Sequence, residues 1–320
     1  MKNLKVGLAG LGVMGKNHLR VLSQLDGVDL VAVYDIESHT IPKSINAKFV
    51  SSLDELLSAG IDYCVVSAPT STHFEIGLQL ANHGIHALIE KPVTTNPIEA
   101  RKLIVAFAEK NLIGGVGHVE RFNPAIQAMR EKIAEGLLGD VFQIATRRQG
   151  PFPPRVSDVG VVKDLATHDI DLTMWVMQDD YQSISSQISH RSGRQNEDLL
   201  VAIGKLKSGV IVSHLVNWLS PFKERNVTII GSNGALVADT LTSDLTLLEN
   251  GTQTDSWDGV ATFRGVSEGT VTRFALEKTE PLLAEHIAFR DAVRTRDTSG
   301  VVTFQQGLIT LEVADRLLTS

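Results

Sequence analysis

The sequence predicts an α/β protein with two domains: an N-terminal doubly wound parallel sheet and a C-terminal α+β domain with a large, open, mostly antiparallel sheet. Three observations support this. Short apolar β-rich segments alternate with helical segments in the first third of the chain, a glycine-rich turn follows the first segment, and a run of successive strands comes later. Alternating strands and helices favour parallel strands joined by right-handed crossovers. We therefore expect domains at 1–118 and 119–320.

The first domain is predicted from apolar runs bounded by helical patterns. The expected strands are Lys5–Ala9, Leu30–Tyr34, Asp62–Ser67, His86–Ile89 and Leu112–Val116, and the expected helices are Met14–Leu25, Leu53–Ser58, His73–His83 and Pro97–Lys110. The strands are almost continuously apolar, which is typical of a parallel sheet covered on both faces.

The second domain is predicted from strands that follow one another across short Gly, Asn and Asp turns, which favours an antiparallel or mixed open sheet. The expected strands are Val141–Arg147, Ser183–Ser189, Leu199–Leu206, Val210–Asn217, Asn226–Ile230, Leu236–Asp239 and Asp244–Glu249, and the expected helices are Pro124–Glu135, Val162–Val176, Pro281–Arg296 and Phe304–Leu318. A proline-rich turn at 151–154 cannot join the interior of a sheet.

Composition limits the function classes. A chain of 320 residues with 43% apolar and 21% charged residues is typical of about two globular domains. The net charge of −7 disfavours a nucleic-acid or anionic-membrane partner. Glycines interrupt the apolar N-terminus, no apolar run approaches a membrane span, and Cys64 has no partner for a disulfide. We expect a cytoplasmic protein that acts on a small molecule.

The turn after the first strand has the dinucleotide-binding pattern of a Rossmann domain. It reads Gly10-Leu11-Gly12-Val13-Met14-Gly15. The first glycine permits the tight turn, the second lets the backbone approach a pyrophosphate, and the third allows close helix–strand packing. Asp35 ends the next strand at the required distance, and its carboxylate suits ribose hydroxyls and repels a 2′-phosphate. The motif predicts NAD as the cofactor, the alternative for Asp35 being a surface turn residue.

The tripeptide Glu90-Lys91-Pro92 closes an apolar strand, at the sheet edge where doubly wound folds bind ligands. The Lys91 ammonium suits a substrate oxygen on which negative charge develops. Glu90 is a candidate to orient Lys91, and Pro92 to fix the turn with a cis peptide bond. The alternative for Lys91 is an ordinary solvated lysine.

A second candidate group lies in the segment 162–171. Asp164 and His168 have i, i+4 spacing and share one face of the predicted helix. Histidine exchanges protons near neutral pH, and a neighbouring carboxylate raises its basicity. Asp171 lies on the same face, so we considered a metal site, but no second ligand cluster accompanies it and we expect no metal. The remaining alternative is a helix with a satisfied polar face.

These motifs in order, with His18 after the glycine-rich turn, resemble the glucose–fructose oxidoreductase / inositol dehydrogenase / rhizopine catabolism (Gfo/Idh/MocA) family over essentially the whole chain. The resemblance implies a bound nicotinamide dinucleotide and homodimers or homotetramers. It also implies that Lys91, His168 and Asp164 are catalytic and that Pro69, Thr70, His73, Glu90 and Lys91 line the nicotinamide side of the cofactor site.

Segments 118–124 and 147–155 resemble the branch of this family that oxidises UDP-N-acetylglucosamine at C3. Arginine forks suit the oxygens of a diphosphate. The candidate substrate-binding residues are Arg121, Asn123, Arg147, Arg148, Arg155 and His168. Solvated surface arginines and pairs between subunits are the alternatives for the arginines. Two other functions stay open: a dehydrogenase of a free sugar or polyol such as inositol, and a non-catalytic protein that senses a dinucleotide.

Overall fold

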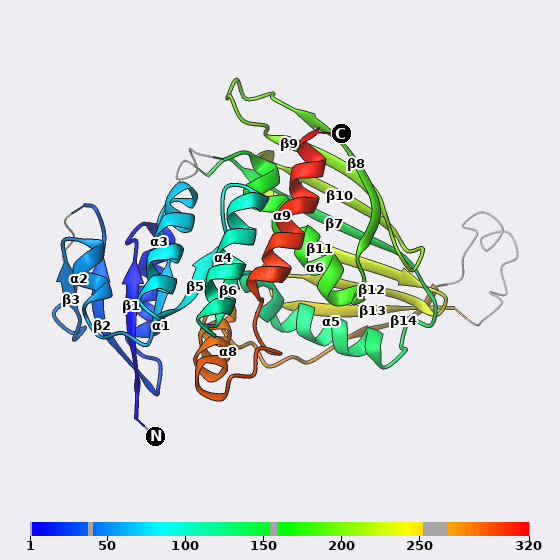
Figure 1. Cartoon of the computed structure of the whole chain (residues 1–320). Helices are drawn as coiled ribbons and strands as arrows, with labels where there is room; N and C mark the ends of the chain where they lie inside the picture. Colours follow the sequence, from blue (N-terminus) through cyan, green and yellow to red (C-terminus); the bar gives the residue numbers. More distant parts are fainter. Residues whose placement is uncertain (1, 38–40, 154–158, 252–267, 320) are drawn as a thin grey trace, which may run out of the picture. The chain divides into compact units, whose positions relative to one another are not determined.

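Figure 1 shows a computed structural model of the chain, which describes residues 2–37, 41–153, 159–251 and 268–319. The chain forms two compact units. Unit 1 contains Met1–Val119 and Glu280–Glu312, and unit 2 contains Glu120–Thr279 and Val313–Ser320.

Unit 1 is built on a six-stranded sheet in the order β3-β2-β1-β4-β5-β6, in which every paired strand is parallel. Its strands are β1 (Leu4–Ala9), β2 (Val28–Tyr34), β3 (Lys48–Val50), β4 (Tyr63–Val66), β5 (His86–Glu90) and β6 (Gly114–Gly117). Strand order reverses between β1 and β4, which is the topological switch point where doubly wound folds bind ligands. The expected Rossmann fold is confirmed.

The helices of unit 1 are α1 (Val13–Leu22), α2 (Leu53–Leu57), α3 (Thr70–Asn82), α4 (Pro97–Glu109) and α8 (Pro281–Thr295). Two of these helices, α2 and α4, begin at a side-chain cap. Ser52 caps α2 and Asn96 caps α4, each through a side-chain oxygen that accepts a backbone N–H three residues later. β3 was absent from our expectation because three residues at a sheet edge carry too short a pattern to recognise.

The expected domain division differs from the structure at the C-terminal end. We placed all of 119–320 in the second domain, but Glu280–Glu312 belongs to unit 1. Phe289 of α8 is fully buried in the core of unit 1, where its ring lies 5.4 Å from that of Tyr63. Arg290 and Arg294 donate to the carbonyl oxygens of Asp26 and Gly27. These contacts are far apart in sequence, so the local pattern of α8 does not reveal them.

Unit 2 contains an eight-stranded sheet in the order β14-β13-β12-β11-β7-β10-β9-β8. Its strands are β7 (Val141–Pro151), β8 (Tyr181–Ser189), β9 (Leu199–Leu206), β10 (Ile211–Asn217), β11 (Leu219–Gly231), β12 (Gly234–Asp239), β13 (Asp244–Asn250) and β14 (Glu268–Arg273). β7 and β10 pair in parallel and the other neighbours are antiparallel. This confirms the expected open, mostly antiparallel sheet.

Helices cover one face of this sheet (Figure 1). Unit 2 contains a 3₁₀ turn (Val119–Phe122), α5 (Pro124–Ala134), a π-helical turn (Val162–Ala166) and α6 (Thr167–Met177), and α9 (Phe304–Thr319) ends in it. Ile126 and Met129 of α5, Ile170 of α6 and Leu317 of α9 share one core with the buried residues of the sheet. Among the described residues, no helix of this unit covers the other face of the sheet.

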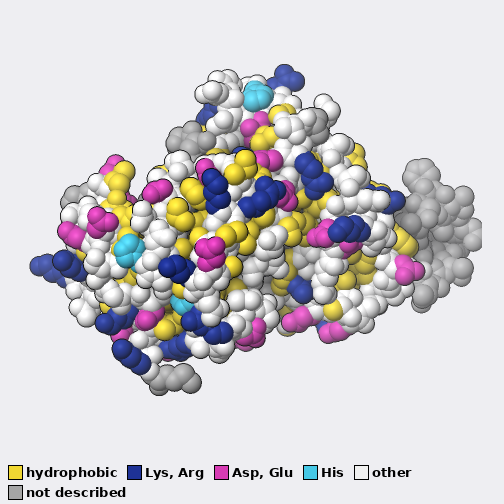
Figure 2. All heavy atoms as spheres, in the orientation of Figure 1, with side chains coloured by type: hydrophobic (Ala, Val, Ile, Leu, Met, Phe, Trp, Pro, Cys, Tyr) yellow, Lys and Arg dark blue, Asp and Glu magenta, His cyan; other side chains and the backbone are white. Residues whose placement is uncertain are grey.

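None of the helices in the described ranges is long and apolar enough to cross a membrane. On the face of the molecule shown in Figure 2, basic and acidic side chains are interspersed with hydrophobic ones.

Candidate functional site

At each of three positions in the glycine-rich turn of unit 1, glycine is required for a different physical reason. Gly10 has φ +96°, a left-handed conformation that favours glycine. A Cβ on Gly15 would lie 2.0 Å from the Gly10 carbonyl oxygen, so α1 can approach the turn only without that atom. A Cβ on Gly12 would meet nothing within 4 Å. The protein itself therefore leaves the space beside Gly12 open, as the close approach of a pyrophosphate requires.

The N-terminus of α1 lies at this turn. Gly12 is the N-cap, and no side chain caps the helix there. The first backbone N–H groups of a helix carry partial positive charge and favour a phosphate. Val13 and Met14 supply those groups here. The turn and the helix terminus thus fit the dinucleotide that the sequence predicts.

Asp35 lies directly after β2, where its carboxylate accepts backbone N–H groups from Leu11 at 2.5 Å and Glu37 at 2.9 Å. These bonds hold the acidic group beside the glycine-rich turn. Ile36, which our sequence analysis did not select, is 86% exposed. The sequence signal that could have found Ile36 is a large apolar residue directly after the acid that is predicted to bind the ribose. Such an exposed surface suits the flat face of an adenine ring.

Pro69, Thr70 and His73 begin α3, directly after β4. His73 is buried, with Nδ1 3.0 Å from the carbonyl oxygen of Pro92 and Nε2 2.9 Å from that of Ala68. This imidazole links the start of α3 to the segment after β5. The Lys91-Pro92 peptide bond is cis, as the sequence analysis anticipated. His73 therefore contacts the backbone of Pro92, the residue that directly follows Lys91.

Glu90 ends β5 and is almost completely buried. Its Oε1 lies 3.0 Å from His18 Nε2, and its Oε2 accepts the Lys91 backbone N–H at 3.1 Å. Burial alone would raise the pKa of Glu90, but the hydrogen bond from His18 and the charges of His18 and Lys91 lower it below its ordinary value. Glu90 is therefore an ionised, fixed partner of the Lys91 backbone.

In unit 2, Asp164 lies in the π-helical turn and His168 in the first turn of α6. We expected a single α-helix, and the turn differs because its i→i+5 hydrogen bonds widen the backbone at Asp164. π-Helical turns of this kind are frequent at functional sites. Asp164 is buried and His168 is half-buried.

Glu197, which lies before β9, holds the start of this turn in place. Its carboxylate accepts the Val162 N–H at 3.0 Å, and its carbonyl accepts the Val161 N–H at 2.9 Å. A Cβ on Gly160 would lie 2.0 Å from the Glu197 carboxylate, so this approach needs a glycine. The sequence analysis missed Glu197 because its partners lie more than thirty residues away.

The predicted substrate arginines have different surroundings. Arg121 is buried and donates to both carboxylate oxygens of Asp171, at 2.7 and 2.6 Å. Arg148 is also buried and donates to Asp169 at 2.9 Å and to Glu120 at 2.8 Å. These are ion pairs inside one domain, which our sequence alternatives did not include. Both guanidinium charges are already matched by carboxylates.

The other residues that we expected to bind substrate lie in different environments. Asn123 caps α5 by accepting the Ala125 N–H and donates to the Thr240 carbonyl. The Arg147 side chain is 64% exposed, on the opposite face of β7 from Arg148, and lies 3.8 Å from Glu224. Arg155 lies outside the described residues. In the described ranges, no group of three His, Cys, Asp or Glu side chains is arranged to hold a metal ion.

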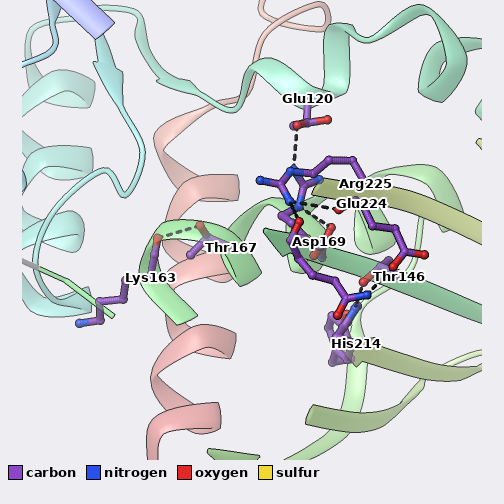
Figure 3. Close-up of polar contacts among 11 residues, drawn as sticks. Glu120, Thr146, Lys163, Thr167, Asp169, His214, Glu224 and Arg225 are labelled. Atoms are coloured by element: carbon purple, nitrogen blue, oxygen red, sulfur yellow. Dashed lines mark hydrogen bonds and ion pairs between the residues drawn. The ribbon is translucent and has the colours of Figure 1, made fainter. Parts of the chain in front are cut away.

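Arg225 is an arginine that the sequence analysis missed. In the strand register, Arg225 of β11 lies opposite Arg148 of β7. Arg225 also lies near Glu120 and Asp169 (Figure 3). Burial, and then the charge of Arg148, lower the pKa of Arg225, and the carboxylates of Asp169, Glu120 and Asp164 act in the opposite direction. One of its nitrogens donates to the carbonyls of Gln149 and Glu224. Arg225 therefore belongs to the same group of charges as Arg148, Asp169, Glu120 and Asp164.

The contrast between two glycines tests the cofactor turn. Gly12→Ala is expected to leave the free energy of unfolding nearly unchanged and to raise the Kd for NAD about tenfold or more, because the new methyl fills only the ligand's space. Gly15→Ala is expected to cost about 3 kcal/mol or more of stability through overlap with Gly10. Urea unfolding and calorimetric NAD titration measure the two effects. Unaltered NAD affinity in Gly12→Ala would refute this placement.

Two family models match the chain. One, described as an oxidoreductase family with an NAD-binding Rossmann fold, matches residues 4–118, and the other, described as the GFO/IDH/MocA C-terminal domain, matches residues 126–237. UDP-N-acetylglucosamine 3-dehydrogenase of Acidithiobacillus ferrooxidans is 33% identical over 177 residues, which span 54% of each chain. Myo-inositol 2-dehydrogenase of Thermotoga maritima is 22% identical over 253 residues, 74% of this chain and 75% of the relative.

Solved structures share the fold. UDP-N-acetylglucosamine 3-dehydrogenase GnnA from A. ferrooxidans superposes with a TM-score of 0.85 at 24% identity, covering 99% of this chain and 97% of that one. An inositol dehydrogenase homolog from Azotobacter vinelandii, complexed with NADH and myo-inositol, superposes with a TM-score of 0.84 at 17% identity, covering 100% and 96%. Both domain models match in order on a chain of this fold, so the chain belongs to the Gfo/Idh/MocA family of oxidoreductases and residues 4–118 are its NAD-binding Rossmann domain.

Proposed function

We propose that the protein is an NAD-dependent dehydrogenase that oxidises a sugar hydroxyl to a ketone, with C3 of UDP-N-acetylglucosamine as the preferred position. The observation that carries the proposal is Lys91, which follows a buried, ionised Glu90 at the carboxyl end of β5 in an NAD-binding domain. A lysine whose backbone is held in this way suits a reacting group better than a solvated surface charge. Asp164 and His168 supply a second, proton-accepting pair.

In this proposal, His168 removes the proton of the reacting hydroxyl, and Asp164 orients and supports the imidazole. The Lys91 ammonium donates to the substrate oxygen and stabilises the negative charge that develops on it. NAD, when bound, supplies the hydride acceptor for the carbon that carries the reacting hydroxyl. Val13 and Met14 would hold the pyrophosphate through their backbone N–H groups, Asp35 would hold the adenosine ribose, and Ile36 would offer an apolar surface to the adenine ring.

Two variants test the reacting groups. Lys91→Met and His168→Ala are each expected to lower kcat about 10²–10⁴-fold with saturating substrate, because each removes a positioned polar group. Absorbance of the nicotinamide product measures turnover. The matched controls are Lys110→Met and His83→Ala, both of which change exposed residues of unit 1 and should retain activity. Near-normal turnover in either test variant would remove that residue from the mechanism.

The substrate is proposed from the similarity to UDP-N-acetylglucosamine 3-dehydrogenase over 54% of the chain. The inositol dehydrogenases are also similar, so a polyol is the second candidate. A diphosphate needs cationic donors that are not already matched by carboxylates. Arg121 and Arg148 are matched in this way, and Arg147 points away from the face of the sheet that α6 covers. We therefore propose Arg225 as the diphosphate contact.

Binding of UDP alone separates the two substrate classes. Arg225→Met is expected to raise the Kd for UDP about tenfold, and the affinity of the unaltered protein should fall with added salt, because phosphate contacts are electrostatic. Arg147→Met, on the other face of β7, should leave this Kd unchanged. Calorimetry measures both. A protein that does not bind UDP but forms NADH with myo-inositol is a polyol dehydrogenase, and one that binds NAD without turnover on any sugar is a dinucleotide sensor.

We further propose that the uncovered face of the unit 2 sheet joins two copies of the chain. Apolar side chains from five strands are exposed on this face, and the strand register places them side by side. They are Val201, Ile203, Ile211, Ile230, Leu248 and Val271. An apolar surface that extends over many strands is typical of a subunit interface.

A charge on this surface tests the interface. Ile203→Lys is expected to shift the protein from dimer or tetramer towards monomer, because a lysine would have to be buried without a partner. Light scattering coupled to size exclusion measures the molar mass. Ile98→Lys, at an equally exposed position on α4 of unit 1, is the control and should leave the mass unchanged. A monomeric unaltered protein would contradict the proposal directly.

A further inference from the structure

Unit 1 contains a buried polar cluster that the proposed chemistry does not explain. It consists of His18 in α1, Glu90 at the end of β5, and Glu285 and His286 in α8, all of them 9% exposed or less. Ionisable groups are rarely buried together unless they are paired, because removal from water is costly. Three separate segments of the chain contribute to this cluster, which makes a chance arrangement of surface residues a poor account of it.

A continuous hydrogen-bonded path runs through the cluster. His286 Nε2 lies 2.9 Å from His18 Nδ1, and His18 Nε2 lies 3.0 Å from Glu90 Oε1. The other oxygen of Glu90 accepts the backbone N–H of Lys91 at 3.1 Å. His18 therefore uses both ring nitrogens, one for α8 and one for the carboxylate that holds Lys91.

The charges of the cluster settle how these bonds are made. The pKa of Glu90 lies below its ordinary value in spite of burial, so this carboxylate accepts and His18 Nε2 donates. Burial, and then the charge of His18, lower the pKa of His286 well below its ordinary value, so His286 is neutral. Only one proton fits between the two facing ring nitrogens. His286 Nε2 therefore donates to His18 Nδ1, and His18 Nε2 donates to Glu90.

Glu285 shows that the cluster accommodates a single negative charge. Burial, and then the charge of Glu90, raise the pKa of Glu285 well above its ordinary value. Neither of its carboxyl oxygens has a hydrogen-bond partner among the described residues. Of the two buried carboxyl groups, Glu90, the one that His18 contacts, has its pKa lowered, and Glu285 has its pKa raised. The hydrogen bond from His18 thus distinguishes the two glutamates.

We propose that His18 is a positioning residue for Lys91: it holds the Glu90 carboxylate, which in turn fixes the Lys91 backbone, while His286 fixes the His18 ring. The proposal rests on the proposed function of Lys91. His18 does not touch substrate in this scheme. Its effect on the reaction passes through Glu90, so loss of His18 should make the reaction sensitive to the protonation of that carboxyl group.

The groups that face His18 define the expected pH dependence. His18 contacts Glu90 and His286, Lys91 and Glu285 interact with the charge of Glu90, and Arg20 on α1 itself is paired with Glu280. The depressed pKa of Glu90 keeps the carboxylate ionised as the pH falls. Without His18 that pKa rises, and the active ionised form is lost at a higher pH. The acidic limb of the kcat profile should therefore move to higher pH.

The experiment compares His18→Leu with His18→Gln, whose amide N–H can still donate to Glu90. His18→Leu is expected to lower kcat about tenfold or more at neutral pH and to shift the acidic limb upward, because it removes a positioning hydrogen bond. His18→Gln should recover most of the activity and the original limb. If His18→Leu changes neither kcat nor the limb, or lowers only the thermal midpoint, the role is structural and the proposal is overturned.

Two further variants separate positioning from general damage. Glu90→Gln should remove the acidic limb, and the double variant with His18→Leu should be no slower than Glu90→Gln alone, since both act through one path. Glu285→Gln is the matched control: it changes a buried carboxyl group of α8 that lies outside the hydrogen-bonded path, and it should retain activity. Additive losses in the double variant would contradict the shared path, even if His18→Leu alone folds poorly.

A readout without substrate keeps this proposal distinct from the proposed function. Nitrogen NMR of ¹⁵N-histidine in the cofactor-free protein at neutral pH should show the ring hydrogen of His18 on Nε2, and Glu90→Leu, which removes the acceptor, should abolish this preference. If no sugar is oxidised but the NMR result holds, the function fails and the His18–Glu90 contact stands. If turnover is normal and His18 Nε2 is not protonated, the function stands and the inference fails.

Discussion

The close contact between α1 and the turn after β1 is the constraint on which much of unit 1 depends. It exists because Gly15 has no Cβ to collide with the Gly10 carbonyl. The same contact has a second consequence one turn later. His18 lies three residues after Gly15 on the same face of α1, so it is carried inward and buried beside Glu90. A glycine selected for cofactor binding thereby also places a histidine behind Lys91.

The partners of buried charged groups differ between the two units. In unit 2, guanidinium groups and carboxylates balance one another: Arg121 with Asp171, and Arg148 with Asp169 and Glu120. In unit 1 there is no arginine in the Glu90 cluster among the described residues, and burial, together with the charge of Glu90, raises the pKa of Glu285 instead. Fixed pairs resist changes of pH, whereas a cluster of histidine and glutamate responds to them. This difference makes the unit 1 cluster the one suited to proton-linked behaviour.

The same rule explains why arginine-rich segments were an uncertain guide to the substrate. A guanidinium group is chemically suited both to a phosphate and to a carboxylate. Arg147 and Arg148 are adjacent in sequence, yet alternation along β7 exposes one side chain and buries the other. Arg225 entered the charge cluster from a different strand, more than seventy residues away. Local sequence carries the chemistry of these residues but not their partners.

The sequence by itself determined the class of both sheets, nearly every helix and strand, and the residues of the dinucleotide turn, because these depend on local periodicity and on glycine and capping chemistry. Residue type and spacing also predicted site roles for Asp35, Lys91, Asp164 and His168, and these roles stay predictions. Only the tertiary structure decided that α8 belongs to unit 1, that Glu197 holds the turn of Asp164, and that His286 lies against His18. These depend on contacts between distant segments, whose burial sets both packing and charge, and no local pattern encodes which distant side chain will arrive.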